Sequence, residues 1–330
     1  MRKSIVLRSA TLLFVLLAPW AHSAERRPNT LTIPAGVEFV NVNVSVLNTR
    51  DRFVTDLARE DFVILEDGVP QETTLFAQKE LPLSLVVLLD MSASMAANVK
   101  AVRSAAQRLV SKLQPEDEAE IIQFNQGLRV LQAFTSDAQA LQAAIRDARP
   151  SGSTALHNVL YITLKDLMRN GPSQQLRRRA VVLLSDGEDT ASMVTDEQVM
   201  ELARAAEINI YSIKIGAPGF DREAVGEQAK YLLNALARES GGEAYFPTEV
   251  SRLAGIYDRI AQELHSQYSI GYIPTNRRLD GAWRQILVVT ARQGVTLRHR
   301  LGYYAVRDGH GARSSDAGAG ASHARSARLP

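Results

Sequence analysis

Residues 83–94 read LSLVVLLDMSAS, a mainly apolar run that ends in an acid followed by two serines. An apolar run of this length is typical of a β-strand that is buried on both faces of a parallel sheet. Asp90 then starts a D-x-S-x-S pattern with Ser92 and Ser94. The stretch therefore predicts a central strand whose carboxyl end carries one carboxylate and two hydroxyls.

The chain that follows alternates between strand and helix patterns. Thr195 and Gln198 have the spacing of a capping box at the start of one of the helices. Further strands are predicted over residues 119–125, 180–186 and 208–216, and helices over residues 102–113, 155–169, 196–206, 224–239 and 249–265. Such alternation predicts an α/β domain over residues 81–266, with a doubly wound, mostly parallel sheet covered by helices on both faces.

Two more polar loops belong to the same edge of this sheet, because ligands of open α/β sheets bind at the carboxyl ends of the strands. Residues 151–154 (SGST) open a predicted helix, and residues 185–187 (SDG) end a buried strand. Taken singly, each loop also fits a helix cap or a turn. Their conjunction favours a metal site made of hard oxygen ligands, which suits Mg²⁺, with Ca²⁺ or Mn²⁺ as alternatives. The candidate ligands are Asp90, Ser92, Ser94, Thr154 and Asp186.

The three motifs together resemble the metal-ion-dependent adhesion site of von Willebrand factor type A domains. They are D-x-S-x-S after a buried strand, Thr154 in a G-S-T-A-L segment, and S-D-G after another buried strand. The resemblance implies that the hydroxyls bind the ion directly and that the two aspartates often act through water. It also implies that an acidic side chain of a partner protein completes the coordination, so that metal binding and protein binding are coupled.

The flanks of the α/β domain read as strands. Residues 25–80 contain the segment DFVILEDGVPQ, in which Asp67-Gly68 is a turn signal, and residues 267–306 contain RQILVVTAR and VTLRHRLGYYA. Neither flank alone has enough strands for a good core, so we expect the two to form one antiparallel β unit, a sandwich, with the α/β domain inserted between them. These flanks resemble an exported bacterial subset of von Willebrand A-related proteins, of the acidobacterial type.

The ends of the chain predict export and a disordered tail. Residues 1–24 combine Arg2, Lys3 and Arg8 with the apolar stretch LLFVLLA and the small residues AHSA, which is the layout of a secretory signal peptide. The stretch is too short for a comfortable transmembrane span, so the mature protein is expected in the periplasm or outside the cell, without a stable membrane span. Residues 307–330 are rich in Gly, Ala, Ser and Arg, and we expect them to be disordered.

Composition excludes several classes of function. The chain has no cysteine, which rules out disulfides, thiolate zinc sites and cysteine nucleophiles. Its net charge is only +2 and its basic residues are dispersed, so no nucleic-acid footprint stands out. The exception is the arginine run 177–179, which we interpret as a solvated loop end rather than a binding patch.

The sequence therefore predicts a non-enzymatic, cation-dependent protein-binding module whose partner is an unknown protein that offers an Asp or Glu. Two alternatives stay open. One is a structural envelope protein in which the metal only stabilises the fold. The other is a magnesium-dependent phosphoryl-transfer enzyme with Asp90 as the nucleophile, a chemistry that usually needs a second acid two residues on and a lysine near the metal. Position 92 is a serine, and no lysine follows in the three loops.

Overall fold

The computed structural model describes residues 39–78, 81–170, 176–186, 189–215 and 223–305. The predicted signal peptide, residues 1–24, and the predicted tail, residues 307–330, lie outside the described residues. Among the described helices, none is both long enough and apolar enough to cross a membrane.

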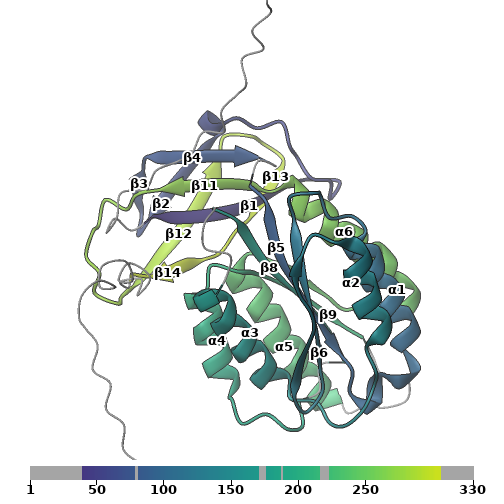
Figure 1. Ribbon diagram of the computed structural model, residues 1–330. Coiled ribbons are helices and arrows are strands. Elements are labelled where there is room, and N and C mark those ends of the chain that lie inside the picture. The colour runs from purple at the N-terminus through teal and green to yellow at the C-terminus, as the bar shows by residue number, and fades with distance from the viewer. Residues whose placement is uncertain (1–38, 79–80, 171–175, 187–188, 216–222, 306–330) are drawn as a thin grey trace, which may run out of the picture. The chain divides into compact units, whose positions relative to one another are not determined.

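A six-stranded sheet forms the centre of the α/β domain (Figure 1). Its strands, in spatial order, are β10 (Ala244–Tyr245), β9 (Asn209–Lys214), β8 (Arg178–Ser185), β5 (Leu83–Asp90), β6 (Glu118–Phe124) and β7 (Leu128–Thr135). All neighbouring pairs are parallel except β6 with the edge strand β7. Every residue of β5 is buried, as expected of a central strand that is covered on both faces. The predicted doubly wound sheet is confirmed.

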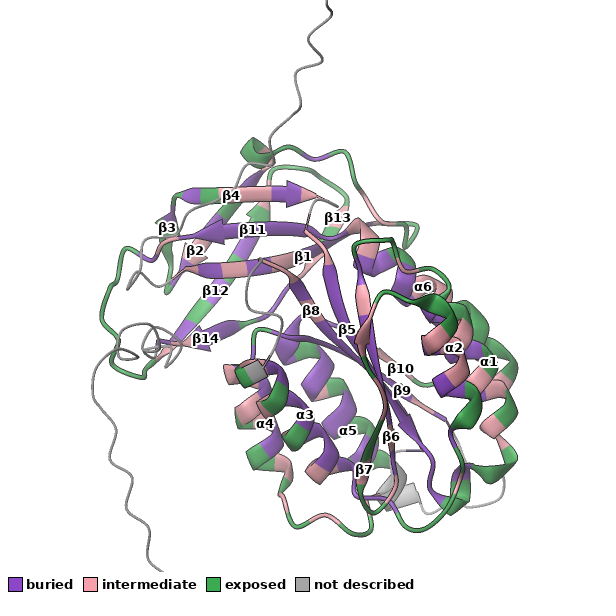
Figure 2. Ribbon diagram, viewed as in Figure 1, coloured by how far each residue is buried: buried purple, intermediate pink, exposed green. Residues whose placement is uncertain are grey.

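Helices cover both faces of this sheet (Figures 1 and 2). One face packs against α1 (Val99–Val110), α2 (Ala138–Asp147) and α6 (Leu253–Ser266), and the other against α3 (Leu156–Asn170), α4 (Asp196–Ala205) and α5 (Glu223–Ser240). Short 3-10 turns are η1 (Arg59–Asp61), η2 (Ala93–Ala97) and η3 (Val250–Arg252). The capping box of α4 forms as predicted, with Thr195 and Gln198 exchanging hydrogen bonds. Strand β7 and helix α2 were not predicted from the sequence.

Strands from both flanks make two four-stranded sheets. One sheet has the order β13 (Val295–Arg298), β1 (Val40–Asn48), β11 (Tyr268–Tyr272) and β4 (Thr73–Gln78), and the other β14 (Gly302–Tyr304), β12 (Trp283–Thr290), β2 (Phe62–Glu66) and β3 (Val69–Gln71). Because β1 pairs with both β11 and β13, and β2 pairs with β12, each sheet mixes the two flanks. Val44, Ile64, Ile270 and Ile286 belong to their shared core. The expectation of one β unit built from both flanks is confirmed.

The turn between β2 and β3 shows why the sequence folds this way locally. Asp67 and Gly68 both have positive φ, 48° and 80°. Two consecutive residues in this region make the type of two-residue turn whose twist matches that of the flanking strands. Gly68 adopts it without a steric penalty, so the predicted turn closes the β2–β3 hairpin.

A buried polar cluster joins the β unit to helix α6. Glu263 on α6 is fully buried, forms an ion pair with Arg298 of β13, and accepts hydrogen bonds from Ser45 of β1 at 2.7 Å and Tyr211 of β9 at 3.0 Å. The amide of Gln267, just after α6, donates to Ser45 at 3.2 Å. A buried carboxylate is tolerated only when it is paired and hydrogen-bonded. This cluster therefore fixes α6 to strands β1 and β13 of the β unit and to strand β9 of the six-stranded sheet.

The arginine run 177–179 is not the solvated loop end that the sequence suggested. Arg178 is only 3% exposed, and its guanidinium donates to the carbonyls of Leu81 and Leu264. Arg177 donates to the carbonyls of Leu83 and Glu116. The carbonyls of Leu81, Leu83 and Glu116 lie at or just before the start of β5 and β6, and that of Leu264 lies in the last turn of α6, where helix carbonyls lack partners within the helix. That prediction was wrong because it read the charges without the tertiary partners.

Candidate functional site

Asp90 lies at the carboxyl end of β5, and its side chain is fully buried. One carboxylate oxygen, Oδ1, accepts the backbone amide of Ser92 at 2.9 Å. The other, Oδ2, accepts the hydroxyl of Ser185, at the end of the neighbouring strand β8, at 2.6 Å. The carboxylate thereby ties the loop after β5 to the end of β8, which keeps the two loops of the site in register.

The two serines and the second aspartate meet beside Asp90. The Ser92 and Ser94 hydroxyl oxygens are 3.0 Å apart, and the Ser94 hydroxyl donates to Asp186. Ser92 and Asp186 are buried, whereas Ser94, in the first turn of η2, is exposed. The group therefore has a closed side made by the sheet edge and an open side at Ser94.

The loop that carries Thr154 lies against the Asp90 loop. The amide of Ala93 donates to the Gly152 carbonyl at 2.9 Å, and the amide of Ser151 donates to the Met91 carbonyl at 2.7 Å. Thr154 is 3% exposed, and its carbonyl accepts the amide of Thr190 at 2.9 Å in the loop after Asp186. The structure thus brings together the three loops that carry the five predicted residues. The four side chains of Asp90, Ser92, Ser94 and Asp186 are linked by hydrogen bonds. The backbone of Thr154 is hydrogen-bonded to Thr190, in the loop after Asp186.

The carboxyl group of Asp90 is costly to ionise in the folded protein. Burial raises its pKa from the ordinary 3.8 to about 6. The hydrogen bond from Ser185 works against this rise, while the negative charge of Asp186 adds to it. A cation at this edge would favour the ionised form of Asp90 and reverse the rise in its pKa.

Two residues of the loop after Asp186, Asp189 and Ser192, build the start of helix α3 and were not identified from the sequence. Asp189 accepts the amide of His157 at 2.8 Å, and Ser192 accepts the amide of Asn158 at 3.0 Å. The first amides of a helix have no partner within the helix, so these side chains cap α3 from a different loop. The spacing D-x-x-S is a local turn signal, but only the fold shows which helix it caps. Asp189 is partly buried and has a structural role at the start of α3.

The donor set fits a small hard cation. In an octahedral Mg²⁺ shell with bonds of 2.0–2.1 Å, neighbouring oxygens lie about 2.9 Å apart, and the two serine hydroxyls here are separated by 3.0 Å. Within the described part of the chain, no three His, Cys, Asp or Glu side chains gather into a metal-binding group. Hydroxyls therefore have to supply ligands at this edge, and together with the two carboxylates they form a set of oxygen donors that could hold a divalent cation.

Comparisons with known proteins point to the same fold. A model of the family described as von Willebrand factor type A domain matches residues 85–188. A UPF0353 protein from Mycolicibacterium paratuberculosis is 27% identical over 228 residues, which cover 63% of this chain and 67% of that protein. Inter-alpha-trypsin inhibitor heavy chain H6 from Homo sapiens is 25% identical over 222 residues, 60% of this chain but only 16% of that protein.

Among solved structures, a von Willebrand factor type A protein from Catenulispora acidiphila has a TM-score of 0.47 and 13% identity, and the match covers 82% of this chain and 76% of that one. The family match over residues 85–188 includes β5, Thr154 and Asp186, which are the elements and loops of the site. Over residues 85–188, the α/β domain of this chain is therefore similar to von Willebrand factor type A domains.

Proposed function

We propose that the chain is an exported, non-enzymatic binding module that holds a divalent cation, Mg²⁺ first, and through it an acidic residue of a partner protein. The ligands would be Asp90, Ser92, Ser94, Thr154 and Asp186. The observation that supports this most is that two buried carboxylates from neighbouring strands, Asp90 and Asp186, lie beside a pair of hydroxyls at one sheet edge. Burying two like charges together is costly unless a cation compensates them.

The side chains of the site have different roles. Ser92 and Ser94 are neutral oxygen donors, and the exposed position of Ser94 leaves one side of the site open to a partner. Asp90 already accepts a hydrogen bond on each of its two oxygens, so its main task is to orient the Ser92 amide and the Ser185 hydroxyl. Bound among few direct carboxylates, Mg²⁺ would supply an electrophilic coordination position that suits a carboxylate of the partner.

Thermal unfolding of the full chain in EDTA, Mg²⁺, Ca²⁺ and Mn²⁺ tests the metal site. A ligand at a hundred times its dissociation constant stabilises the folded state by about 2.7 kcal/mol, which is readily measured. Thr154→Ala and Asp186→Asn should lose the cation-dependent rise in melting temperature. Ser153→Ala removes an exposed hydroxyl one residue away and should keep the rise. If no cation shifts the melting temperature of the unmodified chain, the proposal of a resident cation fails.

Binding of an acidic partner is tested separately. The immobilised full chain is probed with short peptides that contain Asp or Glu and with their Asn or Gln counterparts, in Mg²⁺ and in EDTA. Retention of the acidic peptides only, and only with Mg²⁺, supports the adhesion-type function. A cation-dependent melting shift without such retention favours the structural alternative, and release of phosphate from a chromogenic phosphate ester favours the phosphoryl-transfer alternative. Cleavage after Ala24, found by sequencing the mature amino terminus, would support export.

A further inference from the structure

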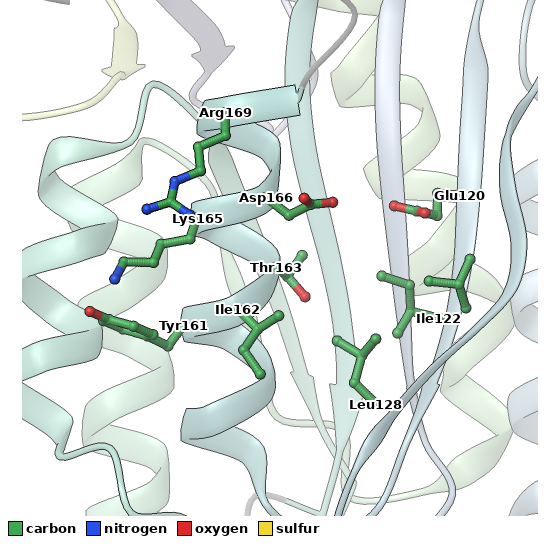
Figure 3. Close-up of a pocket in the computed structure, with 10 residues that line it drawn as sticks. Glu120, Ile122, Leu128, Tyr161, Ile162, Thr163, Lys165, Asp166 and Arg169 are labelled. Carbon is green, nitrogen blue, oxygen red and sulfur yellow. The ribbon is translucent and has the colours of Figure 1, made fainter. Parts of the chain in front are cut away.

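A cavity with three polar groups at one end lies on the α3 side of the sheet. Its volume is about 330 Å³, and it is lined by Glu120, Ile122, Leu128, Val130, Tyr161, Ile162, Thr163, Lys165, Asp166 and Arg169. These residues come from β6, β7 and α3 (Figure 3). Glu120 lies four residues before Phe124, the residue of β6 whose carbonyl accepts the amide of Met91 beside the metal-site loops. At about 3.3 Å per residue along a strand, Glu120 lies about 13 Å from that edge.

One end of the cavity gathers three acceptor groups. In Figure 3 the carboxyl groups of Glu120 and Asp166 point toward each other, and Thr163 points into the space below them. Thr163 is 3% exposed, and its hydroxyl oxygen is buried without a hydrogen-bond partner in the described structure. A buried hydroxyl without a partner costs about 1–3 kcal/mol. Its presence at this position therefore points to a donor that the described residues do not supply.

Glu120 carries an electrostatic cost of its own. It is 9% exposed, and burial, followed by the negative charge of Asp166, raises its pKa to about 7. A positive group between the two carboxylates would remove this cost. The ammonium of Lys165 is turned elsewhere in Figure 3, since it lies over the ring of Tyr161, 4.4 Å from its centre.

The rest of the cavity is apolar. Ile122, Leu128, Val130 and Ile162 line it, and Val130 and Ile162 are both about half exposed, so the cavity is reachable from solvent. A hydrated metal ion gains nothing from such walls, and two carboxylates are fewer than the ligands that a hard cation without a hydration shell requires. An alkyl chain fills the same space favourably. A primary ammonium has three N–H donors, which matches two carboxylates and one hydroxyl.

We infer that the cavity between α3 and strands β6 and β7 binds a primary ammonium group on an apolar stem. The ammonium donates to Glu120, Asp166 and Thr163, and the stem packs on Ile122, Leu128 and Ile162. A lysine side chain of a protein and a free alkylamine share this chemistry. The site is separate from the metal site and does not depend on it.

Titration of the full chain with n-butylammonium at pH 8, followed by methyl NMR, tests the site. The methyl signals of Ile122, Leu128 and Ile162 should shift in a saturable way. 1-Butanol has the stem without the charge, and tetramethylammonium has the charge without N–H donors, so both should bind at least about tenfold more weakly, the usual effect of losing a charged hydrogen bond. Glu120→Gln should weaken binding by about tenfold or more, whereas Glu201→Gln, an exposed acid on α4, should leave binding unchanged.

Thr163→Val keeps the test independent of folding, because it replaces an unpartnered buried hydroxyl with an isosteric methyl and should not destabilise the chain. It should nevertheless weaken n-butylammonium binding by about fivefold. N-acetyl-lysine methylamide and cadaverine serve as further ligands, and the tighter of the two indicates whether a protein or a free amine is the source. Three results would overturn the inference. The first is that n-butylammonium causes no saturable shift of the methyl signals, and the second is that 1-butanol binds as tightly as n-butylammonium. The third is that Mn²⁺ broadens these methyl signals in the Asp186→Asn chain, which would make the cavity a divalent-cation site.

Discussion

Replacing Asp90 by asparagine should make the metal-free protein more stable at neutral pH. Burial raises the pKa of Asp90 from 3.8 to about 6 in the folded protein, so folding favours the protonated acid. The stability that this acid contributes is therefore fully present below about pH 4 and is lost as the pH rises through 6. A pKa difference of about two units corresponds to about 3 kcal/mol at pH 7.5. An asparagine side chain at this position cannot ionise and does not lose this stability.

Urea unfolding in EDTA between pH 4 and pH 7.5 measures the effect. The free energy of unfolding of Asp90→Asn, minus that of the unmodified chain, should rise by about 2.4 kcal/mol over this range, because part of the effect is already present at pH 4. The comparison isolates Asp90 because the other titrating groups are the same in both proteins. With saturating Mg²⁺ the order should reverse at pH 7.5, since the cation stabilises only the chain that keeps its carboxylate.

The result that would refute the reasoning is a difference that stays constant within about 0.5 kcal/mol across the pH range, which is the usual error of additivity. It would mean that Asp90 is ionised in the folded protein as easily as in the unfolded chain. The two buried carboxylates would then need no cation, and the electrostatic argument for the metal site would fail.

Three further substitutions test the framework that holds the site. Glu263→Gln should lower the free energy of unfolding by about 3 kcal/mol, because it breaks the buried ion pair with Arg298 that joins α6 to the β unit. Urea unfolding measures this loss, with Glu201→Gln as the control. An unchanged unfolding midpoint would show that the ion pair is not needed for stability. Arg178→Met should lower the free energy of unfolding by about 2 kcal/mol, because it leaves backbone carbonyls without a hydrogen-bond donor. The control Arg108→Met, in an exposed ion pair, should lower it by less than about 1 kcal/mol. Equal losses would contradict the structural role of Arg178. Asp189→Ala should lower the free energy of unfolding by about 1–2 kcal/mol, because it removes a cap of α3. It should also weaken the cation-dependent rise in melting temperature. An unchanged melting temperature, with and without the cation, would argue against capping from the neighbouring loop.

Features that depend on local pattern could be predicted from the sequence. The apolar run of β5, the capping box at Thr195 and the Asp67-Gly68 turn each carry their signal within a few residues, and all three form as expected. The convergence of the loops that carry Asp90, Thr154 and Asp186 could also be predicted, because the carboxyl ends of parallel strands lie at one edge of the sheet. The shared β unit followed from the need for enough strands to bury a core.

Features that depend on contacts between distant segments could not be predicted. Strand β7 lies at the sheet edge with mostly half-buried residues and an irregular register with β6, so its pattern is weak. Arg178 looks like a surface charge until the carbonyls of Leu81 and Leu264 are placed beside it. The proximity of Glu120 and Asp166 brings together acids from β6 and α3, which are far apart in the sequence. Only the tertiary structure brings such groups together.

The most direct test of the central claim is Mn²⁺ binding followed by electron paramagnetic resonance, in which the signal of free Mn²⁺ falls as the ion binds. The account predicts that the full chain binds a single Mn²⁺ that Mg²⁺ displaces, that Thr154→Ala and Asp186→Asn lose this binding, and that Ser153→Ala retains it. Absence of stoichiometric Mn²⁺ binding by the full chain, or equal binding by Asp186→Asn, would contradict the claim that these five residues form a cation site.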